Sequence, residues 1–137
     1  MDYLYFLRQR LDFLRRFYET AVPPFEETKR KIDAREPPFN LEAPADDDEP
    51  PFLSEWQDAE QSLDVLGRAC ISFTASALQV FLREHEQEFR QEWGDTISIP
   101  AFDPRNAKKV GWLREYQRLF AAVFVDFERS GADLAVI

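Results

Sequence analysis

Several residue types on which many enzymes and metalloproteins depend are scarce in this sequence. It has one cysteine, Cys70, and one histidine, His85, among 137 residues. One cysteine excludes a disulfide within the chain and is typical of a reducing compartment, so we expect a cytoplasmic protein. Glycine is scarce as well, with four residues. The sequence has neither a glycine-rich phosphate loop nor a Cys-x-x-Cys zinc spacing.

Long apolar runs and evenly spread charge are also missing. No uninterrupted apolar run approaches the roughly 18 residues of a membrane span, and arginines interrupt the N-terminus where a signal peptide would have its apolar core. The net charge is −9, and no Lys or Arg lies among the ten acidic residues from Glu36 to Asp64. This balance argues against phosphate binding by the whole surface, although Lys108 to Arg118 and the first helix could supply local basic patches.

The few reactive side chains do not form a catalytic or metal-binding set. Cys70 and His85 fall on one predicted helix, ~22 Å apart along its axis, which excludes a Cys–His dyad within the chain. A di-iron site needs two Glu-x-x-His pairs and is excluded by the single histidine. We interpret His85 as a surface residue and Cys70 as a small core residue. The sequence therefore predicts no catalytic, cofactor-binding or metal-binding residue, and no cofactor.

What the sequence does have is apolar residues at helical spacing. Leucines recur every three to four residues from about Asp2 to Ala21, which predicts an amphipathic helix. A second row lies alongside and consists of Phe6, Phe13 and Phe17. A helix that is apolar on two sides usually packs against two neighbours, or against one neighbour and another subunit. Pro23-Pro24 is expected to end or kink this helix, and a polar helical stretch follows it.

An acidic, proline-rich linker, residues 36–52, comes next. Its sequence EPPFNLEAPADDDEPPF has five prolines and six acids, which neither a helix nor a central strand tolerates. The motif Pro-Pro-Phe occurs three times in the chain and ends at Phe25, Phe39 and Phe52. One interpretation is a ligand for a partner's aromatic groove. The favoured interpretation is a solvated crossover whose phenylalanines attach it to the helices.

Two further long helices are predicted after the linker. The longer one begins at a Ser54/Gln57 capping box and runs to about Trp93, and its second half, apolar on several faces, is expected to be buried. After a β-prone stretch, Asp103 and Pro104 begin the next helix, which Gly131 closes.

We therefore expect a single helical domain, residues 1–137. Its fold class is all-α, as an up-down helical bundle of three long helices plus a short helix, with a long acidic Pro-rich crossover loop.

The chain from about residue 52 to 137 resembles a known group of helical proteins. The segment FLSEWQDAEQSLDVLGRACISFTASALQVFLRE is followed by GWLREYQRLF and VDFERSGADLAVI. This order resembles HEPN-like proteins, in which a long helix precedes a Gly-Trp-Leu/Phe-x-x-Tyr-x-x-Leu/Phe helix and a Ser-Gly/Pro-x-Asp turn. The matching positions are Gly111, Trp112, Leu113, Tyr116, Leu119, Phe120, Ser130, Gly131 and Asp133.

The resemblance implies an all-α bundle that tends to dimerise. Many members are metal-independent ribonucleases of toxin–antitoxin, phage-defence or RNA-processing systems, and others are non-catalytic binding modules. The active members carry an Arg-x(4–6)-His motif on the last helix. In this chain no Arg precedes His85 at that spacing, and the last helix is expected to stop after its first turn, at Ile137. The chain thus looks like a truncated member or a natural short form.

These observations predict a non-catalytic HEPN-like interaction protein. A bundle without its last helix leaves an apolar groove between the central stripe and the preceding helix, which a second copy or a partner protein would fill.

The alternative is a truncated HEPN-family ribonuclease, of toxin or phage-defence type, whose catalytic helix is absent from this chain. RNA would then be a partner by family resemblance only. An acidic mimic of nucleic acid, based on residues 36–64, is disfavoured by its prolines. We expect neither a membrane nor a small-molecule cofactor among the partners.

Overall fold

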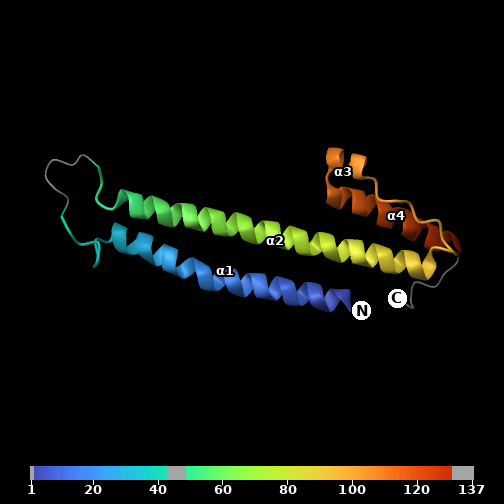
Figure 1. Cartoon of the computed structure of the whole chain (residues 1–137), viewed down its shortest axis with the longest axis horizontal. Helices are drawn as coiled ribbons and strands as arrows, with labels where there is room; N and C mark the ends of the chain where they lie inside the picture. The colour runs from blue at the N-terminus through green and yellow to red at the C-terminus, as the bar shows by residue number, and fades with distance from the viewer. Residues whose placement is uncertain (1, 43–48, 131–137) are drawn as a thin grey trace. The chain divides into compact units, whose positions relative to one another are not determined.

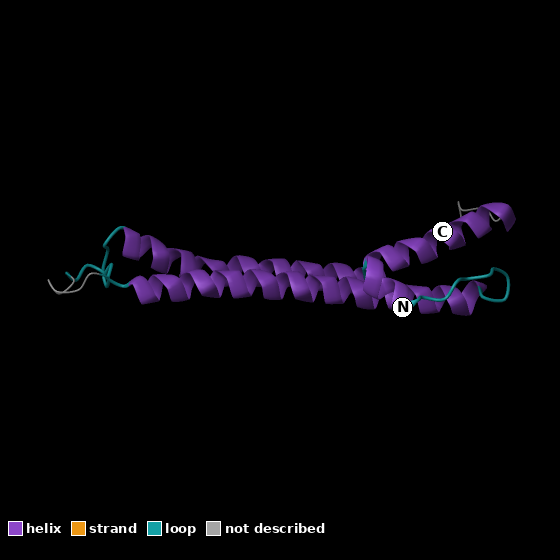
Figure 2. Cartoon of the chain, turned by 90° about the horizontal axis from the view of Figure 1, so that it is seen from above, coloured by secondary structure: helices purple, strands orange, loops and turns teal. Residues whose placement is uncertain are grey.

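The computed structural model describes residues 2–42 and 49–130, and they are all-α. Four helices follow one another in this range: α1 (Tyr3–Asp33), α2 (Leu53–Trp93), α3 (Pro104–Val110) and α4 (Trp112–Ser130). Figure 2 shows no strand in the described part of the chain. The all-α class is therefore confirmed. The lengths differ from the prediction, because α1 and α2 are long, with 31 and 41 residues, whereas α3 and α4 have 7 and 19.

The two long helices pack antiparallel to each other, and α3 contacts α4 (Figure 1). Contacts along the chain gather into two compact units, one from Asp2 to Ala77 and one from Leu78 onward. Helix α2 runs through both units without a break. The expectation of one domain for residues 1–137 stays a prediction.

The leucine stripe of α1 faces α2, as its spacing predicts. Leu14 of α1 and Ala59 of α2 are buried between the two helices. Farther along the pair, the Lys29 ammonium pairs with the Glu60 carboxylate and lies 4.4 Å from the centre of the Trp56 ring. The apolar contact therefore sets which side of α1 turns inward, and the cation adds a contact at the rim.

Helix α1 does not end at Pro23-Pro24, where the sequence predicted an end or a kink. Both prolines lie inside the helix, which continues to Asp33. Two missing N–H donors are tolerated because the inward stripe continues past them to Ile32, which is half-buried. The helix ends in a Schellman motif: the Arg35 N–H donates to the Ile32 carbonyl at 3.1 Å and the Glu36 N–H to the Lys31 carbonyl at 2.9 Å.

The two Pro-Pro-Phe motifs of the linker meet at its base. The rings of Phe39 and Phe52 lie edge to face with centroids 5.1 Å apart, and both side chains are half-buried. This contact favours the crossover interpretation over a free peptide ligand. Helix α2 then begins at Leu53, and the Ser54 hydroxyl donates to the neighbouring Glu55 carboxylate at 2.9 Å. The predicted capping box at Ser54 is therefore wrong.

The second unit has a small core of its own. Ile97, from the stretch between α2 and α3, packs with Leu119 and Val123 of α4, and all three are buried. Five partly buried side chains surround them: Phe89, Trp93, Ile99, Phe102 and Phe120. The β-prone stretch therefore contributes to a helical core and forms no strand.

An arginine of α2 holds this stretch in place. The Arg90 guanidinium donates to the Glu86 carboxylate at 2.8 Å and to the backbone carbonyls of Ile99 and Pro100. Because backbone carbonyls of an irregular segment have no ladder partner, a guanidinium with several donors can satisfy two of them at once.

The predicted helix after Asp103 is divided at Gly111. Asp103 caps α3 as expected, with its carboxylate accepting the Arg105 N–H at 2.8 Å and Pro104 at the first position. Gly111 then takes φ +93° and ψ 145°, a conformation that side-chain-bearing residues avoid. Its N–H closes α3 and its carbonyl accepts the first hydrogen bond of α4, from Glu115.

Candidate functional site

The outer row of phenylalanines on α1 is exposed. Phe6, Phe13 and Phe17 are 54%, 52% and 45% exposed, while the neighbouring leucine stripe faces α2. The rings of Phe13 and Phe17 stack at 6.3 Å between centroids, and Phe6 lies on the same side of the helix two turns earlier. We call these three residues the aromatic row. Of the two apolar sides of α1 that the sequence predicted, the leucine side thus packs against α2 and the side with the aromatic row is exposed.

The middle of α2 is also exposed. An 18-residue stretch of this helix has mean hydropathy 1.5, and none of it is buried. By length and composition alone, that stretch would suffice to cross a membrane. From Val65 to Leu82 the only charged residue is Arg68, and Ile71 is 71% exposed. The expectation that the second half of this helix is buried is therefore wrong for residues such as Ile71 and Val80, because no helix of the described ranges covers them.

The apolar stripe of α4 is buried within its own unit. Tyr116, Leu119 and Val123 all have little exposed surface, and the Tyr116 ring contacts the rings of Phe102 and Phe120. The exposed large apolar residues of the described chain therefore lie mainly on α1 and α2.

A buried carboxylate joins α3 to α4. The Glu115 side chain is 0% exposed and accepts hydrogen bonds from the Asp103 N–H at 3.0 Å, from the Asn106 amide and from the Arg118 guanidinium. The hydrogen bonds from Arg118, and then those from Asn106 and the Asp103 N–H, outweigh burial and lower the pKa of Glu115 to about 2. This carboxylate stays ionised and holds the corner between the two helices, so it is unsuited to proton transfer near neutral pH.

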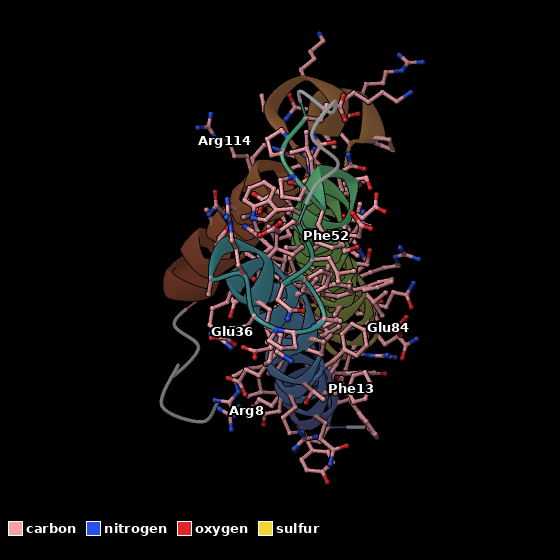
Figure 3. All side chains as sticks on the ribbon, turned by 90° about the vertical axis from the view of Figure 1, so that its left-hand side faces the viewer. Arg8, Phe13, Glu36, Phe52, Glu84 and Arg114 are labelled. Atoms are coloured by element: carbon pink, nitrogen blue, oxygen red, sulfur yellow. The ribbon has the colours of Figure 1, made fainter. Side chains whose placement is uncertain are left out.

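That corner carries a cluster of bases on its outside. Arg105, Lys108 and Lys109 lie on α3, Arg114 lies on α4, and all four are exposed. Figure 3 shows the labelled Arg114 side chain projecting away from the helix. We call these four residues the basic corner. In the described part of the chain, no ion pair involves any of them.

His85, the one histidine, is exposed on α2 as the sequence predicted, yet it is not surrounded by charge alone. Its ring stacks on Phe81 at 5.8 Å between centroids and lies 6.1 Å from the Phe120 ring. Nearby, burial raises the pKa of the Tyr116 hydroxyl, and the Glu86 charge adds to this effect. Neither arrangement includes a nucleophile beside a base, which acid–base or nucleophilic catalysis would need.

Cys70 and His85 lie on one continuous helix, as their assignment predicted. Cys70 is partly buried and has a free thiol. The matching positions of the HEPN resemblance divide between described and undescribed residues. Gly111 lies at the junction of α3 and α4, and the positions from Trp112 to Ser130 fall on α4, whereas Gly131, Asp133 and the expected last turn lie outside the described residues.

The sequence marked Lys108 to Arg118 as a possible basic patch, but it did not show that Arg105 belongs to the basic corner or that Glu115 organises it. Gly111 was the signal in the sequence that could have shown the corner, because glycine often ends a helix. Lys108 and Lys109 precede it and Arg114 follows it, so a turn at Gly111 brings these bases together. Compared with models of known protein families, with curated proteins and with solved structures, the chain matches none.

Proposed function

We propose that this chain is a non-catalytic helical interaction protein that associates with a second copy through the aromatic row of α1. The observation that carries the proposal is the exposure of Phe6, Phe13 and Phe17 on a helix whose other apolar side is occupied. A contiguous apolar surface of this kind on a water-soluble protein normally marks an interface.

The surface has enough apolar area to form the centre of an interface. A phenylalanine ring has a side-chain surface of roughly 200 Å², so half-exposure leaves about 100 Å² on each of the three rings. At about 25 cal/mol per Å², burying all three contributes about 7 kcal/mol before the costs of association. A stable interface needs about 800 Å² on each partner, so the row supplies its centre and other residues supply the remaining area.

A second copy fits this surface better than a lipid bilayer does. The apolar stretch of α2 includes Arg68, which is exposed and would enter the hydrocarbon if the helix crossed it. The net charge of −9 also opposes approach to an anionic lipid surface. The HEPN resemblance, which implies a dimerising bundle, points in the same direction.

The proposal is tested by the concentration dependence of the mass. Sedimentation equilibrium from about 1 to 100 µM should show the wild-type chain passing from one chain to two, as expected for micromolar association. The triple variant F6S/F13S/F17S should keep the mass of one chain throughout. Leu41→Ser is the matched control, because Leu41 is an exposed leucine outside the helices, and it should behave as wild type.

Two results would overturn this proposal. One is a wild-type chain that stays a single chain over the whole range, and the other is a triple variant that associates as strongly as wild type. Flotation with phosphatidylcholine/phosphatidylserine vesicles completes the test. Binding to vesicles that the triple variant loses, without any self-association, would assign the row to a membrane surface.

A second candidate, a HEPN-type ribonuclease whose catalytic helix lies outside these 137 residues, is favoured by the exposed middle of α2. A further helix packed over Ile71 and Val80 would cover that surface. This candidate predicts that the reading frame continues beyond Ile137 with an Arg-x(4–6)-His motif. The longer chain should then cleave RNA, and substitution of that histidine should abolish the cleavage.

A further inference from the structure

The basic corner is a local inversion of the charge of this protein. Residues 104–118 contain five Lys or Arg and a single acid, Glu115, in a chain with net charge −9. That acid is buried and already bonded to Arg118 and Asn106, so it does not neutralise the outer bases. Arg105, Lys108, Lys109 and Arg114 therefore present a net positive surface, and the exposed Asp103 carboxylate that caps α3 offsets one of their charges.

The large apolar side chains that are exposed between these bases are aliphatic. Val110 and Leu113 are both exposed beside Lys109 and Arg114. The aromatic residue of this region, Trp112, is half-buried and packs edge to face on Tyr116, with ring centroids 6.4 Å apart. Single-stranded nucleic acid is bound by basic grooves that also offer exposed rings for base stacking. A basic surface with aliphatic residues instead suits a protein partner that is acidic and partly apolar.

The chain itself carries such a complementary surface at the start of α2. Glu55 and Asp58 are exposed, and neither forms an ion pair in the described part of the chain. Val65 follows Asp58 by seven residues, so the two share a face of the helix, and Val65 is exposed. No Lys or Arg lies between Glu36 and Asp64 to neutralise these carboxylates. We call Glu55, Asp58 and Val65 the acidic face.

We propose that, when two copies associate, the basic corner of one copy binds the acidic face of α2 in the other. The inference rests on the proposed self-association but uses residues separate from the aromatic row. Exposed bases and carboxylates that pair across an interface gain modest Coulomb energy, while aliphatic residues between them lose contact with water. The aromatic row supplies apolar area, and the charged contact selects the orientation of the two copies.

Charge reversal tests the pairing directly. K108E/K109E puts two carboxylates in place of the lysines and lowers the charge of the four-residue corner from +4 to zero, and in E55K/D58K the helix face becomes basic. Each variant alone should associate at least about tenfold more weakly than wild type at ~50 mM NaCl, because like charges then face each other. The two variants mixed in equal amounts should associate as strongly as wild type, because the carboxylates introduced at the corner of one variant then meet the lysines introduced on the face of the other.

The quadruple variant K108E/K109E/E55K/D58K should also associate with itself at the wild-type level. Wild-type association should weaken as NaCl is raised to ~500 mM, since exposed charge pairs are screened at that ionic strength. The association of K108E/K109E alone and of E55K/D58K alone should instead strengthen over the same range, because salt screens the repulsion between like charges. Analytical ultracentrifugation of fluorescently labelled chains measures all of these species.

The failures of the two proposals can be told apart. F6S/F13S/F17S could lose association while the mixture of K108E/K109E and E55K/D58K does not regain wild-type association. That pair of results would support the aromatic interface and overturn the charged contact. Association that is equally strong at both salt concentrations would also overturn it. Binding of a poly(U) oligonucleotide that K108E/K109E loses, without any change in self-association, would reassign the corner to nucleic acid.

Discussion

Leu119 of α4 is the most deeply buried apolar side chain of the second unit, at 1% exposure. We expect Leu119→Ala to destabilise this unit strongly. Leu113→Ala provides the matched control, because it removes the same atoms from the same helix at a position that is 44% exposed. The pair therefore separates the effect of burial from the effect of helix propensity.

The expected magnitude follows from the neighbours of each leucine. Replacing a fully buried leucine by alanine lowers the free energy of unfolding by roughly 2.7–5 kcal/mol in the best-studied series, and the loss rises with the volume of the cavity that remains. Around Leu119 the second layer, including Trp93 and Phe120, is only partly buried and can relax inward. We therefore expect about 3 kcal/mol. At Leu113 about half of the surface is already in water, so we expect about 1 kcal/mol.

Native-state hydrogen exchange measures the difference where it arises. The amides from Trp112 to Val123 exchange when the helix opens. The equilibrium constant for this opening should be about 30-fold larger in Leu119→Ala than in Leu113→Ala, because the two expected costs differ by about 2 kcal/mol. Exchange in α1 should change little in either variant, because α1 belongs to the other unit.

The same measurement can refute the reasoning. Equal effects of the two substitutions would show that Leu119 is not at the centre of a packed core. A cost below about 1 kcal/mol for Leu119→Ala would show the same.

Three further predictions concern backbone and charge. Gly111→Ala should destabilise the protein by about 1–3 kcal/mol, because φ +93° and ψ 145° disfavour any side chain, although no atom lies within 4 Å of the added carbon. Gly67→Ala, inside α2, should instead stabilise it by about 0.5–1 kcal/mol. Chemical denaturation that gives both changes the same sign would contradict this argument. Glu115 has a pKa of about 2 in the folded chain against a usual value of 4.5, so its contribution to stability is full above about pH 4.5 and is lost as the pH falls toward 2. The melting temperature of Glu115→Gln should lack this decline. A parallel decline in the variant and in wild type would refute the role of Glu115. Arg35→Gly should stabilise α1 by about 0.5 kcal/mol, because Arg35 has φ 51° at the helix end and glycine adopts that conformation without strain. The gain is reduced because glycine also raises the entropy of the unfolded chain. A melting temperature below that of wild type would contradict this prediction.

Periodicity located the helices because it follows from the geometry of a single segment. The leucine spacing of α1 and the stripe of α2 require only that one face of each helix meets another apolar surface. Asp103 with Pro104 and the stop at Gly94 were equally readable, since caps depend on the few residues around them. These local signals account for the all-α class and for most helix boundaries.

Three features could not be read in this way. Pro23-Pro24 were expected to end or kink α1, and the helix continues past them because the residues on either side pack against a neighbour. Ser54 was expected to cap α2, yet the chain enters that helix at Phe52, whose ring pairs with Phe39. Glu115 looked like one charge among many on α4, and its burial depends on α3 folding back over it. Each outcome depends on residues distant along the chain.

The amino-acid sequence by itself determined that this protein is helical, that α1 has two apolar sides, and that acids and bases are concentrated in different segments. Only the tertiary structure decided that the leucine side of α1 is covered while the aromatic row stays exposed, and that four bases converge at the turn between α3 and α4. The physical reason is that hydrogen bonding within a helix is local, whereas the choice of which apolar face loses its water depends on which other helix is there to cover it.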